Sequence, residues 1–82
     1  MARRITYANP EERTIAQSLQ RLPNIGPAMA SDLMRLGITS ADELATRDPD
    51  DLYVELGRLD GITHDPCVLD TFMAAVDAAR GL

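Results

Sequence analysis

The stretch Leu22-Pro23-Asn24-Ile25-Gly26-Pro27 predicts a tight turn that leads directly into a helix. Glycine adopts backbone dihedrals that other residues avoid, and asparagine tolerates the left-handed region better than most non-glycine residues. Pro27 has a φ already suited to a first helical position, where its missing amide would have had no partner in any case. We therefore expect a short hairpin, with Gly26 as its most constrained position outside the core.

The residues on both sides of this turn predict two helices. Apolar side chains recur there at helical spacing: Ile15, Leu19 and Leu22 before the turn, and Met29, Leu33 and Leu36 after it. Asn9-Pro10 starts the first helix, which we expect over about residues 10–21, and Gly37 ends the second. The spacing resembles the helix-hairpin-helix motif, which in many families grips a nucleic-acid phosphate.

The remaining chain predicts three more helices and no convincing strand. Ser40-Ala41-Asp42-Glu43 is a capping box, and Asp48-Pro49 and Asp65-Pro66 repeat the device of Asn9-Pro10. The expected buried positions of the last two helices are Leu52, Leu56, Leu59, Leu69, Phe72, Val76 and Ala79. The sequence therefore predicts an all-α domain of about five short helices over residues 9–82, preceded by a mobile tail at 1–8.

Composition and charge limit the classes of function. The chain has 82 residues, a net charge of −5, 45% hydrophobic residues and 4% aromatic ones. Acidity argues against nucleic acid, because modules that bind it usually carry a basic face. One cysteine cannot form an internal disulfide, and neither a secretory signal nor a membrane-spanning run is visible. We therefore expect a cytoplasmic protein without membrane contact.

Four segments together resemble the small bacterial pathogenicity-locus family, whose members are often labelled mitomycin-resistance proteins. The segments are Leu22–Pro27, Leu36–Ala45, Asp48–Tyr53 and Asp65–Phe72, and the resemblance covers residues 18–80. The hairpin half is also similar to the C-terminal domain of the competence regulator TfoX. The resemblance implies a helix-hairpin-helix domain with a SAM-like core, in a family whose biochemical role is poorly defined.

A phosphate site is expected where the hairpin meets the second helix. Backbone amides there would bind an anion with help from the helix dipole. The expected site residues are Asn24, Ile25, Gly26, Ala28, Met29 and Ala30, with Arg21 and Arg35 as the nearest cations. Relatives that grip DNA commonly have Lys at the position of Ala28. In the alternative interpretation, the hairpin is a helix corner whose amides are solvated.

A second, weaker hairpin signal follows in the chain. Leu59-Asp60-Gly61-Ile62 resembles Leu22-Pro23-Asn24-Ile25, as in a duplicated helix-hairpin-helix pair, although two helical hairpins could match in this way by chance. Asp65 as a cap would occupy the amides that a phosphate needs, and Asp60 would repel it. At most one half of the pair is expected to bind DNA.

No pattern indicates catalysis or a metal site. Cys67 follows His64 by three residues, which is compatible with a reactive thiol, but a small buried hydrophobic role is favoured. One Cys and one His cannot complete a zinc site. We expect no enzyme, no cofactor and no small-molecule substrate. Two functions remain: a module that binds duplex DNA weakly and without sequence preference, or a protein-interaction domain in which the hairpin is only structural.

Overall fold

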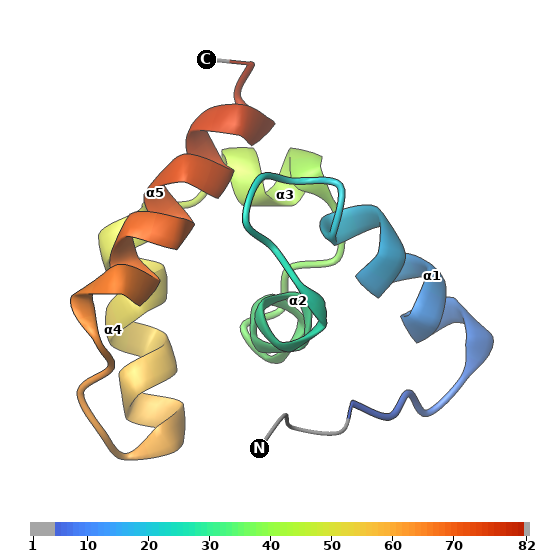
Figure 1. Cartoon of the computed structure of the whole chain (residues 1–82), viewed down its shortest axis with the longest axis horizontal. Coiled ribbons are helices and arrows are strands. Elements are labelled where there is room, and N and C mark those ends of the chain that lie inside the picture. The colour runs from blue at the N-terminus through green and yellow to red at the C-terminus, as the bar shows by residue number, and fades with distance from the viewer. Residues whose placement is uncertain (1–4, 82) are drawn as a thin grey trace.

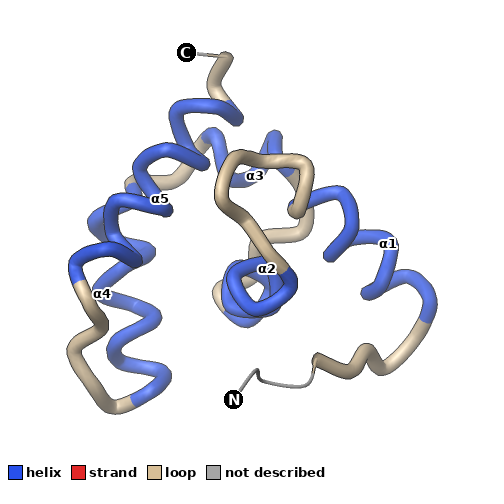
Figure 2. The backbone as a smooth tube through the Cα atoms, viewed as in Figure 1, coloured by secondary structure: helices blue, strands red, loops and turns tan. Residues whose placement is uncertain are grey.

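The computed structural model describes residues 5–81, so the part of the expected tail at residues 1–4 lies outside the described residues. Five α-helices follow one another: α1 (Pro10–Leu19), α2 (Pro27–Arg35), α3 (Ala41–Ala45), α4 (Pro49–Asp60) and α5 (Pro66–Ala79) (Figure 1). Residues 5–81 contain no strand (Figure 2). The predicted all-α fold of five short helices is confirmed, with α1 ending two residues earlier than expected.

Four of the five helices begin at a side-chain cap, as the sequence predicted. In each, a side-chain oxygen accepts a hydrogen bond from a backbone amide in the first turn: Asn9 from Glu12 at 2.9 Å, Ser40 from Glu43 at 3.1 Å, Asp48 from Asp50 at 2.9 Å and Asp65 from Cys67 at 2.8 Å. The exception is α2, where the N-cap residue is Gly26 and no side chain caps the helix. The first turn of α2 is therefore open.

The helices pack as two pairs joined by α3. Figure 1 shows α4 and α5 side by side, α1 on the opposite side, and α2 viewed end-on between them, with α3 above it. One core cluster draws on all five helices and two turns, and its members are Ala16, Leu19, Ile25, Ala30, Leu33, Ile38, Leu44, Leu52, Leu56, Phe72, Ala75 and Val76. This arrangement holds the first hairpin against the core through Ile25, which is 4% exposed.

Three predicted core positions differ from the structure. Leu59 is 54% exposed, because it lies in the last turn of α4 at an open hollow beside Arg35 and Leu36. Leu69 and Ala79 are only partly buried, and the fully buried Ala75 was not predicted. The interior face of α5 is thus centred on Phe72, Ala75 and Val76.

Left-handed glycines follow three helices: Gly37 after α2, Gly61 after α4 and Gly81 after α5. After α2, the Ile38 amide donates to the Leu33 carbonyl at 3.0 Å, and Ile38 is buried. After α4, the Ile62 amide donates to the Gly57 carbonyl at 3.1 Å, but Ile62 is 58% exposed. The same C-terminal geometry therefore buries an isoleucine at one helix end and presents one to solvent at the other.

Candidate nucleic-acid interface

The hairpin forms at the predicted place, and Asn24 carries its unusual backbone conformation. Asn24 has φ 63°, and within residues 5–81 it is the one non-glycine residue with positive φ. The amide of Ile25 donates to the Leu22 carbonyl at 3.3 Å, which closes the turn. Ile25 is buried and Leu22 packs partly against the core, so both residues plug the turn as expected.

Gly26 is not the constrained position that the sequence analysis expected. Its φ of −88° and ψ of −174° are extended values that any residue adopts. A Cβ atom built on Gly26 would meet nothing within 4 Å. Pro27 explains this conformation, because a proline pushes the residue before it into the extended region. The expectation of steric strain at Gly26 is therefore wrong.

The expected amide donors divide into two groups. The Ile25 amide is already bonded to Leu22, and the Ala30 amide donates to the Gly26 carbonyl at 2.9 Å. The amides of Gly26 and Met29 have no hydrogen-bond partner within residues 5–81. Exposed Asn24 precedes both of them in the sequence, and exposed Ala28 lies between them. The turn therefore offers an anion fewer backbone donors than its sequence implies.

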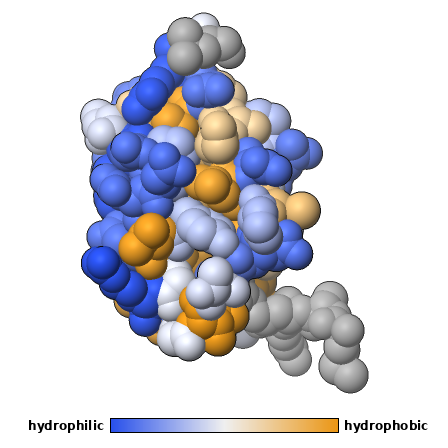
Figure 3. Space-filling view, turned by 90° about the vertical axis from the view of Figure 1, so that its left-hand side faces the viewer, coloured by the Kyte–Doolittle hydropathy of each residue, from blue (hydrophilic) through white to orange (hydrophobic). Residues whose placement is uncertain are grey.

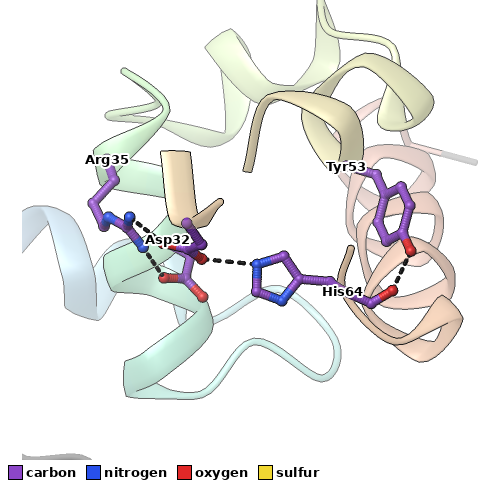
Figure 4. A network of polar contacts seen from close by, with 5 residues as sticks. Asp32, Arg35, Tyr53 and His64 are labelled. Atoms are coloured by element: carbon purple, nitrogen blue, oxygen red, sulfur yellow. Dashed lines mark hydrogen bonds and ion pairs between the residues drawn. The ribbon is translucent and has the colours of Figure 1, made fainter. Parts of the chain in front are cut away.

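The two arginines expected near the site lie at opposite ends of α2. Arg21 is exposed next to the hairpin and makes no ion pair within residues 5–81. Arg35 lies in the last turn, which the helical rise places about 12 Å from the first. Its guanidinium contacts the carboxylates of Asp32 at 3.1 Å and Asp60 at 2.5 Å (Figure 4). Of these two arginines, only Arg21 lies next to the hairpin.

The second hairpin repeats the left-handed residue of the first, but neither its closing hydrogen bond nor its surroundings. Gly61 has φ 68° at the position that matches Asn24. The Asp65 carboxylate accepts the Cys67 amide, and this bond lowers the pKa of Asp65. The Asp60 carboxylate lies 2.7 Å from the His64 ring, and the hydrogen bond from Arg35 is the main cause of the lowered pKa of Asp60. Both carboxylates are thus held ionised, a field that disfavours a phosphate.

Cys67 is exposed, so the expectation of a small buried thiol is wrong in its location. The hydrogen bond and the negative charge of Asp65 raise the pKa of the Cys67 thiol. His64 bonds to Asp60, which leaves it unable to activate the thiol through that ring nitrogen. The thiol is therefore protonated at neutral pH, which favours the unreactive interpretation.

Residues 5–81 contain no group of three or more His, Cys, Asp or Glu side chains placed to hold a metal ion. In that part of the chain, no helix has the length and apolar character needed to cross a bilayer.

Residues 12–81 match the family described as pathogenicity locus. The chain belongs to this family. Members of the pathogenicity-locus family thus share the region that contains both hairpins and all but the first residues of α1. No solved structure matches the chain.

Two curated proteins are similar to this pathogenicity-locus domain. The mitomycin resistance protein McrB of Streptomyces lavendulae is 45% identical over 64 residues, which are 78% of this chain and 61% of that protein. The DNA polymerase IV of Halorhodospira halophila is 44% identical over 50 residues, which are 61% of this chain and 14% of the polymerase. The chain therefore corresponds to about three fifths of the first protein and a small part of the second.

The structure also shows a surface that the sequence analysis did not single out. Large apolar residues are exposed on α4 and in the turn after it: Val54, Leu59 and Ile62. The signal in the sequence was the helical spacing of Leu59 after Leu52 and Leu56, which had been assigned to the core.

Proposed function

We propose that this domain is a small, non-enzymatic, cytoplasmic helix-hairpin-helix module that binds duplex DNA weakly, without sequence preference, through the phosphate backbone. The observation that carries the proposal is the first turn of α2, which has no side-chain cap and no acidic residue. Such a helix start carries a partial positive charge and favours an anion. Arg21 adds a full charge beside it.

The DNA polymerase relative supports the same function. Its name places it among proteins that act on DNA, and 50 residues of this chain are 44% identical to it. The mitomycin resistance relative supports a role in resistance without naming a ligand. The segment shared with the polymerase thus links this fold to a protein that acts on DNA.

Binding is expected to be weak because the hairpin contacts only about one or two phosphates. Each neutralised phosphate contributes about 0.9 to the slope of log affinity against log salt, so the slope should be about −1 to −2. Dipolar amides release fewer counterions than arginine does, and the net charge of −5 adds long-range repulsion. Ala28 lacks the cation that lysine would place beside the phosphate.

The test is a titration of the whole chain with duplex DNA at low salt, followed by backbone amide chemical shifts. We expect the largest shifts at residues 24–30 and weaker binding for Arg21→Ala. Arg13→Ala is the matched control, because Arg13 is also exposed and makes no ion pair within residues 5–81, but lies on α1. Ala28→Lys should tighten binding measurably. Shifts confined to another face, or nanomolar binding at physiological salt, would overturn the proposal.

The second candidate function is a protein-interaction domain in which the hairpin is only structural. It is favoured by the exposed apolar residues on α4 and the following turn, which lie away from the hairpin residues. No binding of duplex DNA, even by Ala28→Lys, would favour this function over the first.

A further inference from the structure

Exposed apolar side chains lie around Arg58 on a surface here called the α4 face and defined by Val54, Arg58, Leu59 and Ile62: Val54 and Ile62 share one hollow with Arg58, and Leu59 shares the next. Val54 is 48% exposed, Leu59 54% and Ile62 58%. Figure 3 looks at the side of the molecule on which α4 and α5 lie and shows apolar residues exposed between polar ones. Single exposed apolar residues are ordinary, but a group beside a groove marks an interaction surface.

An open groove of about 500 Å³ lies on this face, between α4 and the turn that follows it. Gly57 and Gly61 line the groove and contribute no side chains to fill it, whereas Val54 and Ile62 give it apolar walls. The groove therefore has the shape and apolar lining that a large side chain of another molecule requires.

The turn after α4 forms one wall of the groove and is held in place by polar contacts. The Tyr53 hydroxyl donates to the His64 carbonyl, and the His64 ring bonds to Asp60, which is also bound by Arg35 (Figure 4). Gly57 lets the chain turn back closely, because a Cβ there would lie 2.8 Å from the Ile62 carbonyl oxygen. A wall fixed in advance lowers the entropy lost when a partner binds.

Arg58 gives this face its charge. It lines the groove and both of the smaller hollows beside it. Arg35 and Arg47 nearby are paired with carboxylates, but the Arg58 side chain makes no ion pair or hydrogen bond within residues 5–81. An unpaired guanidinium among apolar side chains is complementary to a carboxylate that arrives together with an apolar side chain.

We propose that the α4 face binds an amphipathic helix of a partner protein, which places a large apolar side chain in the groove and a carboxylate against Arg58. A row of phosphates does not fit this face, because the carboxylates of Asp51 and Glu55 line one of the hollows and Asp60 lies beside the groove, which leaves Arg58 as a contact for one carboxylate only. Helix-in-groove recognition uses apolar anchors and flanking charges in this way. The proposal is independent of DNA binding by the hairpin.

The test uses a phage-displayed library of random peptides of about five helical turns, selected on the immobilised whole chain. The enriched peptides should carry a large apolar residue with Asp or Glu one helical turn away. A synthetic copy, titrated into isotope-labelled protein, should shift amides at residues 53–64 and leave those at 24–30 unchanged. Arg58→Glu should weaken binding about tenfold or more, since charge-assisted bonds are among the strong ones.

Controls separate this interaction from general charge and from misfolding. Arg13→Glu changes the net charge equally on α1 and should leave the dissociation constant unchanged. Ile62→Ser should weaken binding while retaining the helical circular dichroism, because Ile62 is exposed. No enrichment, peptides without acids, or binding insensitive to Arg58→Glu would overturn the proposal. A dimer of this chain that Ile62→Ser dissociates would overturn it as well, since a second copy would then cover the face.

Discussion

Gly57 should be the glycine on which the stability of this domain depends most. A Cβ at this position would lie 2.8 Å from the carbonyl oxygen of Ile62, a backbone atom that cannot rotate away. The turn after α4 would have to withdraw by several tenths of an ångström. That shift would strain the bond from the Ile62 amide to the Gly57 carbonyl and the bond from Tyr53 to His64.

Two opposing effects set the magnitude for Gly57→Ala. Alanine favours a helix over glycine by about 1 kcal/mol. Against this, overpacking at a fixed contact costs about 1–3 kcal/mol, and each weakened hydrogen bond contributes about 1 kcal/mol. We expect a net loss of about 1–2 kcal/mol in the free energy of unfolding, or a fall of roughly 4–15 °C in Tm for a domain of this size.

Urea and thermal unfolding followed by circular dichroism measure the free energy of unfolding and Tm, and Gly26→Ala is the matched control. Gly26 has an extended backbone and no atom within 4 Å of a Cβ, so its replacement should leave Tm within about 2 °C, as ordinary surface substitutions do. An unchanged or higher Tm for Gly57→Ala would show that the turn after α4 yields easily and would refute the reasoning.

Three further predictions follow from single groups. Asn24→Val should lower the free energy of unfolding by about 1–2 kcal/mol, because the left-handed conformation is unfavourable for a β-branched residue, and Asn24→Gly should not; urea melts compare the two. Cys67 should react with a neutral-pH thiol reagent more slowly than free cysteine, because Asp65 raises its pKa, and rapid labelling would contradict this. The pKa of Asp60 is lower in the folded protein than in the unfolded chain. The ionised carboxylate therefore stabilises the fold above the unfolded-state pKa, and this stabilisation is lost as the pH falls through the folded-state pKa. Stability should therefore decline below about pH 4, and less steeply for Asp60→Asn, as urea melts across pH would show.

The helix starts could be predicted from the sequence because their signals are local. Asn9, Ser40, Asp48 and Asp65 each bond to an amide only two or three residues away, and the structure contains all four bonds. A cap and the helix it begins are decided within one turn, so no knowledge of the rest of the fold is needed.

Features set by distant parts of the chain could not be predicted in the same way. Arg35 turns away from the hairpin because Asp60, twenty-five residues later, lies beside the end of α2. Leu59 shares the spacing of Leu52 and Leu56, but it is exposed because the elements that cover those two do not reach the last turn of α4. Periodicity gives the face of a helix, and only tertiary packing decides how far along the helix that face is covered.

The identity of the left-handed residue in the hairpin was a local question that the sequence answered only in part, since Asn24 was named as tolerant of this conformation but Gly26 was expected to be the constrained position. Gly26 was expected to need special dihedrals, whereas Asn24 has them. The deciding signal was present in the sequence, since Pro27 forces the residue before it into an extended conformation. Because Gly26 is extended, Asn24 adopts the left-handed conformation that reverses the chain, and asparagine tolerates this conformation better than most non-glycine residues.

Net charge is a poor guide to this hairpin because many of the acids lie at the starts of other helices. Within residues 5–81, α1, α3 and α4 each have a side-chain cap and acids in the first turn, and α5 has the Asp65 cap. Among these helices, α2 alone has neither. The −5 charge of the chain thus leaves one helix start without a local negative group.

Gly26→Asp tests whether this open start is kept for an anion. Gly26 already has the extended conformation of a cap residue and open space around it, so the new carboxylate could accept amides of α2. Stability should then rise by about 0.5–1 kcal/mol through the cap and the helix dipole. DNA binding should fall, because the carboxylate would occupy the same amides and repel phosphate. A rise in Tm together with a loss of amide shifts on DNA addition would separate the two roles of this turn. If the variant gains stability and binds DNA as the parent chain does, the first turn of α2 is not the phosphate site.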